Sequence, residues 1–129
     1  MKAWNSRSYG PAIAPLIAAN TKGALGSGTP NESARAVLAG LDAAAIVAPR
    51  QLANRSMAMC CLAGLWLRHD FLDESHAISQ EIETSGGSYW HGIMHRREGD
   101  FANSQYWFRR VGHHPIFPDL CSAASQLAA

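Results

Sequence analysis

Three histidines and two carboxylates are spaced so that neighbouring helices could bring them together. His91, His95 and Glu98 recur at positions i, i+4 and i+7, which places them on one face of a helix because successive residues turn by about 100°. Upstream, Asp73 and His76 share a helix face at i and i+3. Neutral imidazole and carboxylate groups are ligands that suit Zn, Fe or Mn. The pattern therefore predicts a divalent metal site with the ligands Asp73, His76, His91, His95 and Glu98.

A helical hairpin that turns about Ser85 and Gly86 would place these two faces opposite each other. In that register the facing pairs are His76 with His95, Gln80 with His91, and Asp73 with Glu98. Helical-bundle metalloproteins hold their ligands at such spacings on facing helices. We therefore expect one cluster of three histidines and two carboxylates between the two helices.

Several kinds of chemistry fit this cluster. We expect His91, His95 and Glu98 to be catalytic, beside a metal that activates water for hydrolysis or, as iron, supports oxidation. In a metal-free alternative, one histidine and Glu98 shuttle protons as an acid/base pair. A structural alternative is a buried clasp between histidines and carboxylates, because buried polar groups must find partners. The zinc-protease class is disfavoured, because no Glu follows His91 as the motif H-E-x-x-H requires.

The expected helix over residues 101–111 could supply a wall that binds substrate. Its polar and aromatic side is made of Asn103, Tyr106, Trp107 and Arg110. Its core side is made of Phe101, Ser104, Phe108 and Val111. Arg110 is expected to face the cluster and Arg109 the solvent, because neighbouring residues point about 100° apart. Arginine beside aromatic rings favours planar anions, sugars or aromatic acids through forked hydrogen bonds and stacking.

These features favour a small enzyme with a His/carboxylate pocket, acting on a small anionic or polyhydroxylated substrate by hydrolysis or oxidation. One alternative is the metal-free acid/base enzyme. Another is a non-enzymatic helical-hairpin binding module, in which Trp90, Trp107 and the arginine pairs contact a partner. Arginines beside Tyr and Trp can also stack on single-stranded nucleic acid, but 11 Lys and Arg against 10 Asp and Glu leave a net charge of only +1. Nucleic acid is therefore not an expected partner.

The same region carries a resemblance to a family of uncharacterised bacterial proteins. It rests on the segments SYWHGIMHRREGDFANSQYWFRRVGHHP, HDFLDESHAISQEI and GSGTPN. The similarity runs from about Tyr9 to Phe117, and such a long run of Trp, His and Arg is a specific family mark. The resemblance implies relatives but no activity, so the expected function comes from the residues themselves.

Helices must position all these groups, and the sequence predicts an all-α fold. We expect residues 1–129 to form one small bundle of short antiparallel helical hairpins, with an irregular arm and Gly-rich loop over residues 1–28. Caps, breakers and apolar spacing predict helices over 14–20, 29–41 with Thr29 as N-cap, 42–48 and 51–69. The helix from 51 either continues to 82 or is followed by a new helix capped by Asp70 or Asp73. After a stop at Gly86 and Gly87, the sequence predicts a helix capped by Ser88, then 101–111 after the pair Gly99 and Asp100, and finally 118–127. No stretch shows the alternation of a strand.

Cysteines and the amino-terminal segment suggest where the protein works. The chain has three cysteines, an odd number, and the adjacent pair Cys60 and Cys61 cannot easily bridge within a helix. Reduced thiols and a cytoplasmic location are the simplest expectation. The short apolar patch near the start is interrupted by Pro11 and Pro15, which suits neither a signal peptide nor a membrane span. We expect a small-molecule substrate and no membrane partner, and an oligomer is compatible with the sequence.

Overall fold

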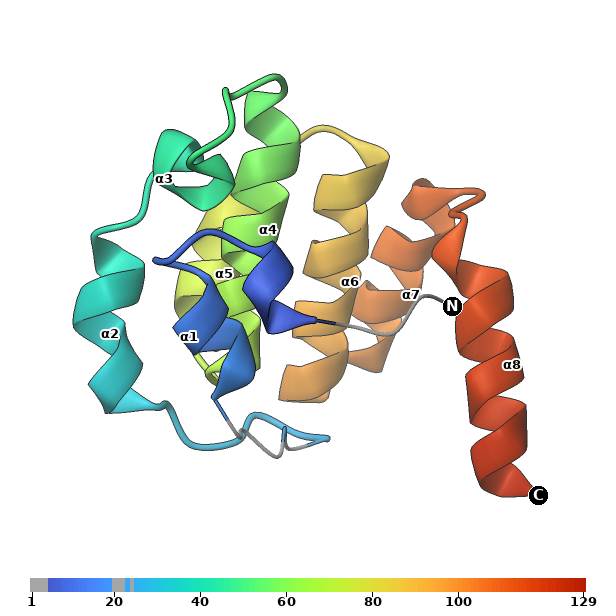
Figure 1. The fold of residues 1–129 in the computed structure, drawn as a ribbon. Coiled ribbons are helices and arrows are strands. Elements are labelled where there is room, and N and C mark those ends of the chain that lie inside the picture. Colours follow the sequence, from blue (N-terminus) through green and yellow to red (C-terminus); the bar gives the residue numbers. More distant parts are fainter. Residues whose placement is uncertain (1–4, 20–22, 24) are drawn as a thin grey trace.

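Helices account for the regular structure in residues 5–19, 23 and 25–129, the part of the chain that the computed structural model describes (Figure 1). The elements in order are a short 3-10 helix Ser6–Ser8, α1 Ala14–Ala18, α2 Glu32–Ala39, α3 Ala43–Val47, α4 Arg55–Arg68, α5 Leu72–Ser79, α6 Ser85–Glu98, α7 Phe101–Val111 and α8 Ile116–Ala128. The prediction of a small all-α bundle is confirmed. Residues 1–4, 20–22 and 24 of the expected arm, including the end expected for the first helix, lie outside the described residues.

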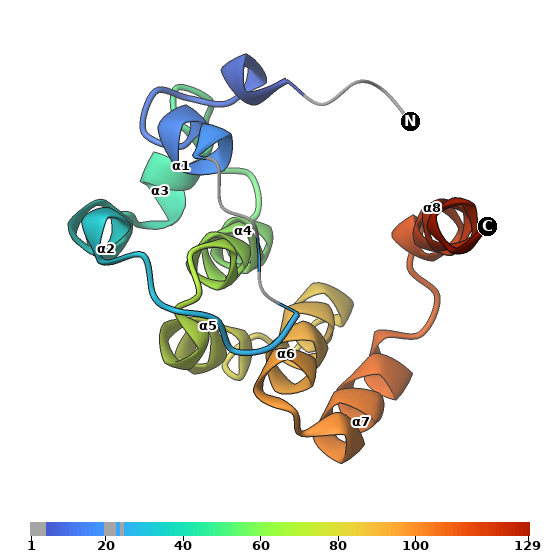
Figure 2. The ribbon, with the colours of Figure 1, turned by 90° about the horizontal axis from the view of Figure 1, so that it is seen from below.

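Helix α4 is the centre of the bundle (Figure 2). The elements α1, α2 and α3 pack on one side of it, α5 and α6 on the other, and α7 lies outside α6. The core residues contributed by α4 are Ala58, Leu62, Leu65 and Trp66. Trp66 meets Phe71 edge-on with ring centroids 5.1 Å apart. Burying each large apolar side chain in this way stabilises the fold by about 1.5–3 kcal/mol.

Polar side chains begin four of the helices by accepting a hydrogen bond from a backbone N–H in the first turn. They are Asp42 for α3, Asn54 for α4, Thr84 for α6 and Asp100 for α7. The stop before α7 is equally clear, because Gly99 ends α6 with a left-handed φ of 91°, which glycine adopts without strain. The predicted helix 101–111 is therefore confirmed.

The start of α2 differs from the prediction. Thr29 is not its cap, because the helix begins at Glu32 and Asn31 occupies the N-cap position. The backbone N–H of Asn31 donates to the carbonyl of His69 at 2.9 Å, and its side-chain amide lies 3.0 Å from His69 Nδ1. These bonds to a distant segment fix the chain at Asn31 and delay the first helical turn.

The turn between α5 and α6 also differs from the prediction. Gly86 and Gly87 do not end a helix but lie in the first turn of α6, which Thr84 caps instead of Ser88. The reason is a close approach between segments. A Cβ atom at Gly87 would lie 2.0 Å from the carbonyl oxygen of Ile82, so only glycine lets the chain fold back this tightly.

Helix α4 does not continue into α5. Asp70 has a left-handed φ of 64°, which breaks the helix, and Phe71 rather than Asp70 or Asp73 is the N-cap of α5. Asp70 instead forms an ion pair with Arg97, and Arg97 also donates to the carbonyl of Leu67 at 2.6 Å. These contacts fasten the end of α6 to the end of α4 and so fix the helix that carries two of the histidines.

The outer helices are less buried than expected. Ser104 and Val111 are buried as predicted, but Phe101 is 61% exposed, because it begins α7 directly after the turn of the α6–α7 hairpin. Helix α8 contributes no buried residue and stands apart from the bundle in both ribbon views. Within the described part of the chain, no helix has the length and apolar character needed to cross a membrane.

Candidate metal centre

Three histidines from two helices meet where α5 and α6 pack together. His76 comes from α5, and His91 and His95 come from successive turns of α6. The ring centroids lie 4.7 Å apart for His76 and His91, 5.3 Å for His76 and His95, and 4.7 Å for His91 and His95. One ring nitrogen from each lies within 4.8 Å of the others. The predicted contact of His76 with His95 is confirmed, and these three residues are called the histidine cluster below.

His91 is the innermost member of the histidine cluster. Its residue is 3% exposed, and its Nδ1 atom is buried with no hydrogen-bond partner among the described residues. The pKa of His91 is lowered to about 4 from the ordinary 6.5, mainly because the ring is buried and to a smaller extent because His76 and His95 are close by. The ring is therefore neutral at physiological pH, and neutral imidazole is the form that binds metals.

Glu98 orients His95. The Nδ1 atom of His95 lies 2.6 Å from Oε1 of Glu98, and because an ionised carboxylate only accepts hydrogen bonds, Nδ1 carries the proton. The lone pair of His95 is then on Nε2. A carboxylate on the far nitrogen is the usual way to fix the tautomer and orientation of a metal-binding histidine. Glu98 thus supports the cluster from outside the set of three nitrogens.

A second group of possible ligands consists of His95, Glu98 and Asp100. Asp100 already has a structural task, because its Oδ1 accepts from the backbone N–H of Asn103 and its Oδ2 from the side chain of Asn103. These two bonds lower the pKa of Asp100. We therefore centre the candidate site on the three histidines.

Asp73 does not join the site as predicted. Its side chain is exposed in the first turn of α5, and it belongs to neither group of possible metal ligands among the described residues. The i, i+3 spacing leaves it about 60° around the helix axis from His76. Gln80, expected opposite His91, is also exposed at the end of α5.

Helix α7 places one aromatic ring of the predicted wall, that of Trp107, against the cluster. Trp107 stacks on His91 with ring centroids 3.9 Å apart and an interplanar angle of 17°. The guanidinium carbon of Arg110 lies 5.4 Å from the Trp107 ring and 5.8 Å from the Tyr106 ring. Asn103 lies elsewhere, because its side chain is bonded to Asp100. Trp107 thus covers His91, and the exposed Tyr106 and Arg110 both lie beside Trp107.

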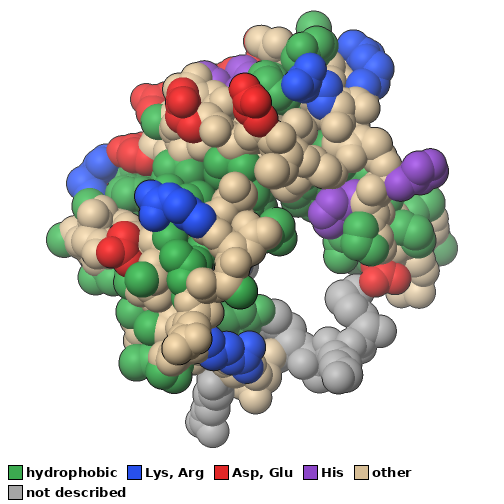
Figure 3. Space-filling view, turned by 90° about the horizontal axis from the view of Figure 1, so that it is seen from above, with side chains coloured by type: hydrophobic (Ala, Val, Ile, Leu, Met, Phe, Trp, Pro, Cys, Tyr) green, Lys and Arg blue, Asp and Glu red, His purple; other side chains and the backbone are tan. Residues whose placement is uncertain are grey.

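The face shown in Figure 3 carries both acidic and basic side chains, and neither sign covers the whole face. This distribution fits the net charge of +1. It gives no extended surface for a polyanion.

Sequence reasoning missed a second region, a cavity lined by Tyr9, Arg50, Cys61 and Trp90 among others. No spacing pattern points to it, because the irregular amino-terminal segment forms one of its walls.

Comparisons of the chain with protein-family models, curated proteins and solved structures gave no match. The candidate functions therefore rest on the histidine cluster and the cavity themselves.

Proposed function

We propose that the histidine cluster binds a divalent metal, with Zn, Fe and Mn as the candidate ions, and that the protein is a metal-dependent enzyme. The observation that supports this most concerns His91. Its neutral imidazole ring is buried beside the rings of His76 and His95, and its Nδ1 atom has no hydrogen-bond partner among the described residues. Burying a polar group without a partner costs about 1–3 kcal/mol. A metal ion would supply the missing partner.

The spacing of the nitrogens is compatible with a metal after a small adjustment. A tetrahedral ion with bonds of about 2.0–2.1 Å holds its ligand nitrogens roughly 3.4 Å apart. The three nitrogens here lie within 4.8 Å of one another, so modest rotation of the rings would close the site. Three protein ligands leave a position for water or substrate, as in catalytic rather than structural zinc sites.

The proposed reaction is hydrolysis or oxidation of a small anionic or polyhydroxylated substrate. The metal supplies activation of water or, as iron, redox chemistry. Glu98 holds His95 in the metal-binding tautomer, and Arg110 on the aromatic wall is placed to bind a negatively charged group. A cytoplasmic location and kinship with the bacterial family that the sequence resembles are parts of the same proposal, and they rest on the sequence alone.

A second candidate is a metal-free acid/base enzyme, which the short contact between His95 and Glu98 favours. In this case Glu98 orients the ring of His95, and His95 takes a proton from the substrate through Nε2. This candidate leaves the buried Nδ1 of His91 without a role.

Metal analysis distinguishes the two candidates. Protein purified without an affinity tag, or refilled with Zn or Co, should contain metal in proportion to the chain, measured by elemental mass spectrometry. His91→Ala and His95→Ala should each abolish that metal content while helicity by circular dichroism stays near wild type, because the apolar core lies elsewhere. The exposed His113 provides the control variant His113→Ala. A wild type that takes up no metal, or an unchanged metal content in either cluster variant, contradicts the metal proposal.

A further inference from the structure

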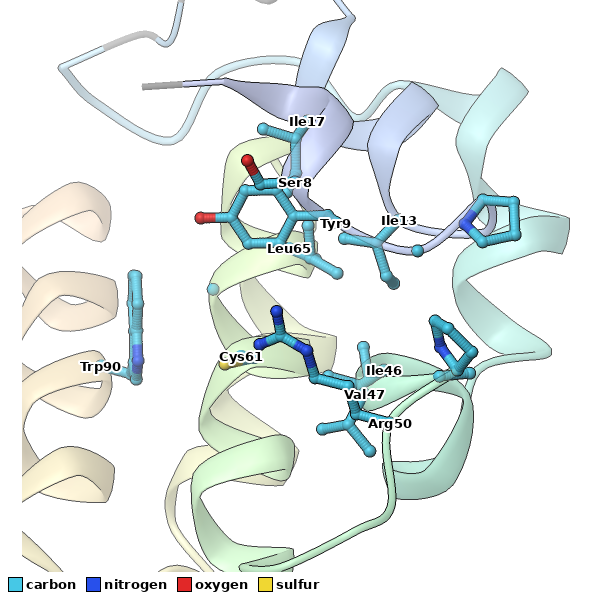
Figure 4. A pocket seen from close by; sticks show the side chains of 15 residues that line it. Ser8, Tyr9, Ile13, Ile17, Ile46, Val47, Arg50, Cys61, Leu65 and Trp90 are labelled. Carbon is cyan, nitrogen blue, oxygen red and sulfur yellow. The ribbon is translucent and has the colours of Figure 1, made fainter. Parts of the chain in front are cut away.

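A cavity of about 740 Å³ lies between the amino-terminal segment, α3 and α4, with Trp90 of α6 on its far side (Figure 4). It shares no residue with the histidine cluster. The apolar side chains that line it are Ile13, Ile17, Ile46, Val47, Leu65 and Trp90. The volume lies within the range of about 300–1,000 Å³ that is typical of small-molecule sites.

Two glycines fix the walls of this cavity. A Cβ atom at Gly10 would lie 2.1 Å from the carbonyl oxygen of Ala48, and one at Gly64 would lie 2.8 Å from the Trp90 ring. The first approach presses the amino-terminal segment onto the end of α3. The second lets the Trp90 indole lie against the backbone of α4. Both walls are thus held by direct packing against the bundle.

Among the described residues that line the cavity, Arg50 is the only charged one. Figure 4 shows its guanidinium group projecting into the space between Tyr9, Cys61 and Leu65. It makes no hydrogen bond or ion pair with any residue in the described part of the chain. Cys61 adds no second charge, because partial burial of its thiol raises the pKa and keeps it protonated, although the residue as a whole is exposed. The cavity therefore combines apolar walls with a single unneutralised cation.

We propose that this cavity binds a small amphipathic carboxylate. The aliphatic or aromatic body of the ligand packs against the isoleucines, Leu65 and Trp90, and its carboxylate receives the forked hydrogen bonds of Arg50. A neutral apolar molecule would gain no ionic contact with Arg50, and a cation would be repelled by it. This binding site is independent of the proposed metal chemistry.

Binding of decanoate to the full-length protein tests the proposal. In a titration followed by two-dimensional nitrogen–proton NMR, decanoate below its micelle concentration should shift the backbone signals of Ile46 and Leu65 and the indole signal of Trp90. Decanol and decylammonium are matched probes with the same chain and a different head group, and each should bind about tenfold more weakly, since a charge-assisted hydrogen bond is lost. Equal affinity for the three probes, or shifts that avoid the cavity, would overturn the proposal.

A pair of arginine variants tests whether Arg50 is the residue that binds the carboxylate. Arg50→Gln should weaken decanoate binding about tenfold and leave decanol binding unchanged. Arg55→Gln is the control, because Arg55 is exposed at the start of α4 and does not line the cavity. Both positions are on the surface, so both variants should fold. Equal losses in the two variants would show a nonspecific effect of charge and contradict the role of Arg50.

Alkylation of Cys61 gives a second readout with an internal control. Decanoate should slow the reaction of Cys61 with a maleimide and leave the reaction of Cys121 unchanged, because Cys121 lies on α8 and does not line the cavity. Peptide mass spectrometry measures both reactions. Absence of selective protection contradicts the proposal. Protection of Cys61 that grows with protein concentration alone would assign the cavity to a second copy of the chain and would also overturn it.

Discussion

His69 and His91 are both almost completely buried, at 1% and 3% exposure, but their surroundings are opposite. The Nδ1 atom of His69 lies 3.0 Å from the side-chain amide of Asn31, and its Nε2 lies 3.0 Å from the carbonyl oxygen of Leu16. His91 has a buried Nδ1 with no partner among the described residues and two other imidazoles beside it. Burial alone therefore does not distinguish a structural histidine from a functional one.

The difference lies in which segments surround each ring. His69 follows the last turn of α4 and joins it to α2 and to the amino-terminal segment, so its two bonds hold three parts of the chain together. His91 lies between α5 and α7, where its neighbours are rings that do not satisfy it. A fully bonded histidine adds to stability, whereas an unbonded one lowers stability and persists where something else requires it.

The largest expected effect is a difference in stability between two variants in which the same substitution, His to Phe, is made at position 69 or at position 91. In metal-free protein, His69→Phe should lower the free energy of unfolding by about 3 kcal/mol, because it leaves the Asn31 amide and the Leu16 carbonyl unbonded. His91→Phe should change it by less than about 1 kcal/mol, because Phe keeps the stacking on Trp107 and removes an unsatisfied nitrogen. Denaturant unfolding measures both.

The two variants add the same ring volume, so the difference between them isolates the hydrogen bonds. Similar losses of stability in both would mean that His91 is as well satisfied as His69, and the comparison would fail.

A somewhat smaller effect is expected in the pH dependence of stability. The pKa of His91 is about 4 in the folded protein against an ordinary 6.5, so between these values the unfolded chain binds a proton that the folded chain does not. In metal-free protein this contribution to stability is complete above pH 6.5 and is lost as the pH is lowered to about 4, by roughly 2 kcal/mol once screening by solvent is included. His91→Phe should remove this part of the pH dependence. A loss of stability that is the same in wild type and variant would show that other groups cause it.

The smallest effect concerns the arginine pair on α7. Both side chains are exposed, but only Arg110 is recorded over aromatic rings, those of Trp107 and Tyr106. In cobalt-loaded protein titrated with inorganic phosphate and followed by visible absorption, Arg110→Lys should weaken phosphate binding about tenfold, because the planar fork is lost. Arg109→Lys should have almost no effect, and neither variant should change the melting temperature. Equal behaviour of the two variants would place Arg110 on an ordinary solvated face.

Local signals in the sequence predict the helices around the site well. Gly99 and Asp100 define the start of α7 because a left-handed glycine and a capping carboxylate act within a few residues. The meeting of His76 with His95 also follows from spacing on two adjacent helices. Such features depend on neighbours in the chain, so they can be derived without the fold.

Other features depend on distant segments and could not be predicted. Thr29 is an acceptable cap, but the bonds of Asn31 to His69 move the start of α2. Gly86 and Gly87 resemble a helix stop, but the second is needed for the close approach to Ile82. The cavity beside Arg50 arises only when the amino-terminal segment packs on α3. In each case a tertiary contact outweighs the local preference.

We expect helix α8 to unfold separately from the bundle. It buries none of its residues, and Phe117 near its start lies beside Tyr89 and Phe108 with ring centroids 6.2 and 6.5 Å away. A helix that contacts the bundle only near its start gains little from the rest of the fold and can unwind from its other end while the bundle stays intact. Its amide hydrogens therefore exchange with solvent through local opening, whereas those of α4 exchange only when the whole bundle unfolds.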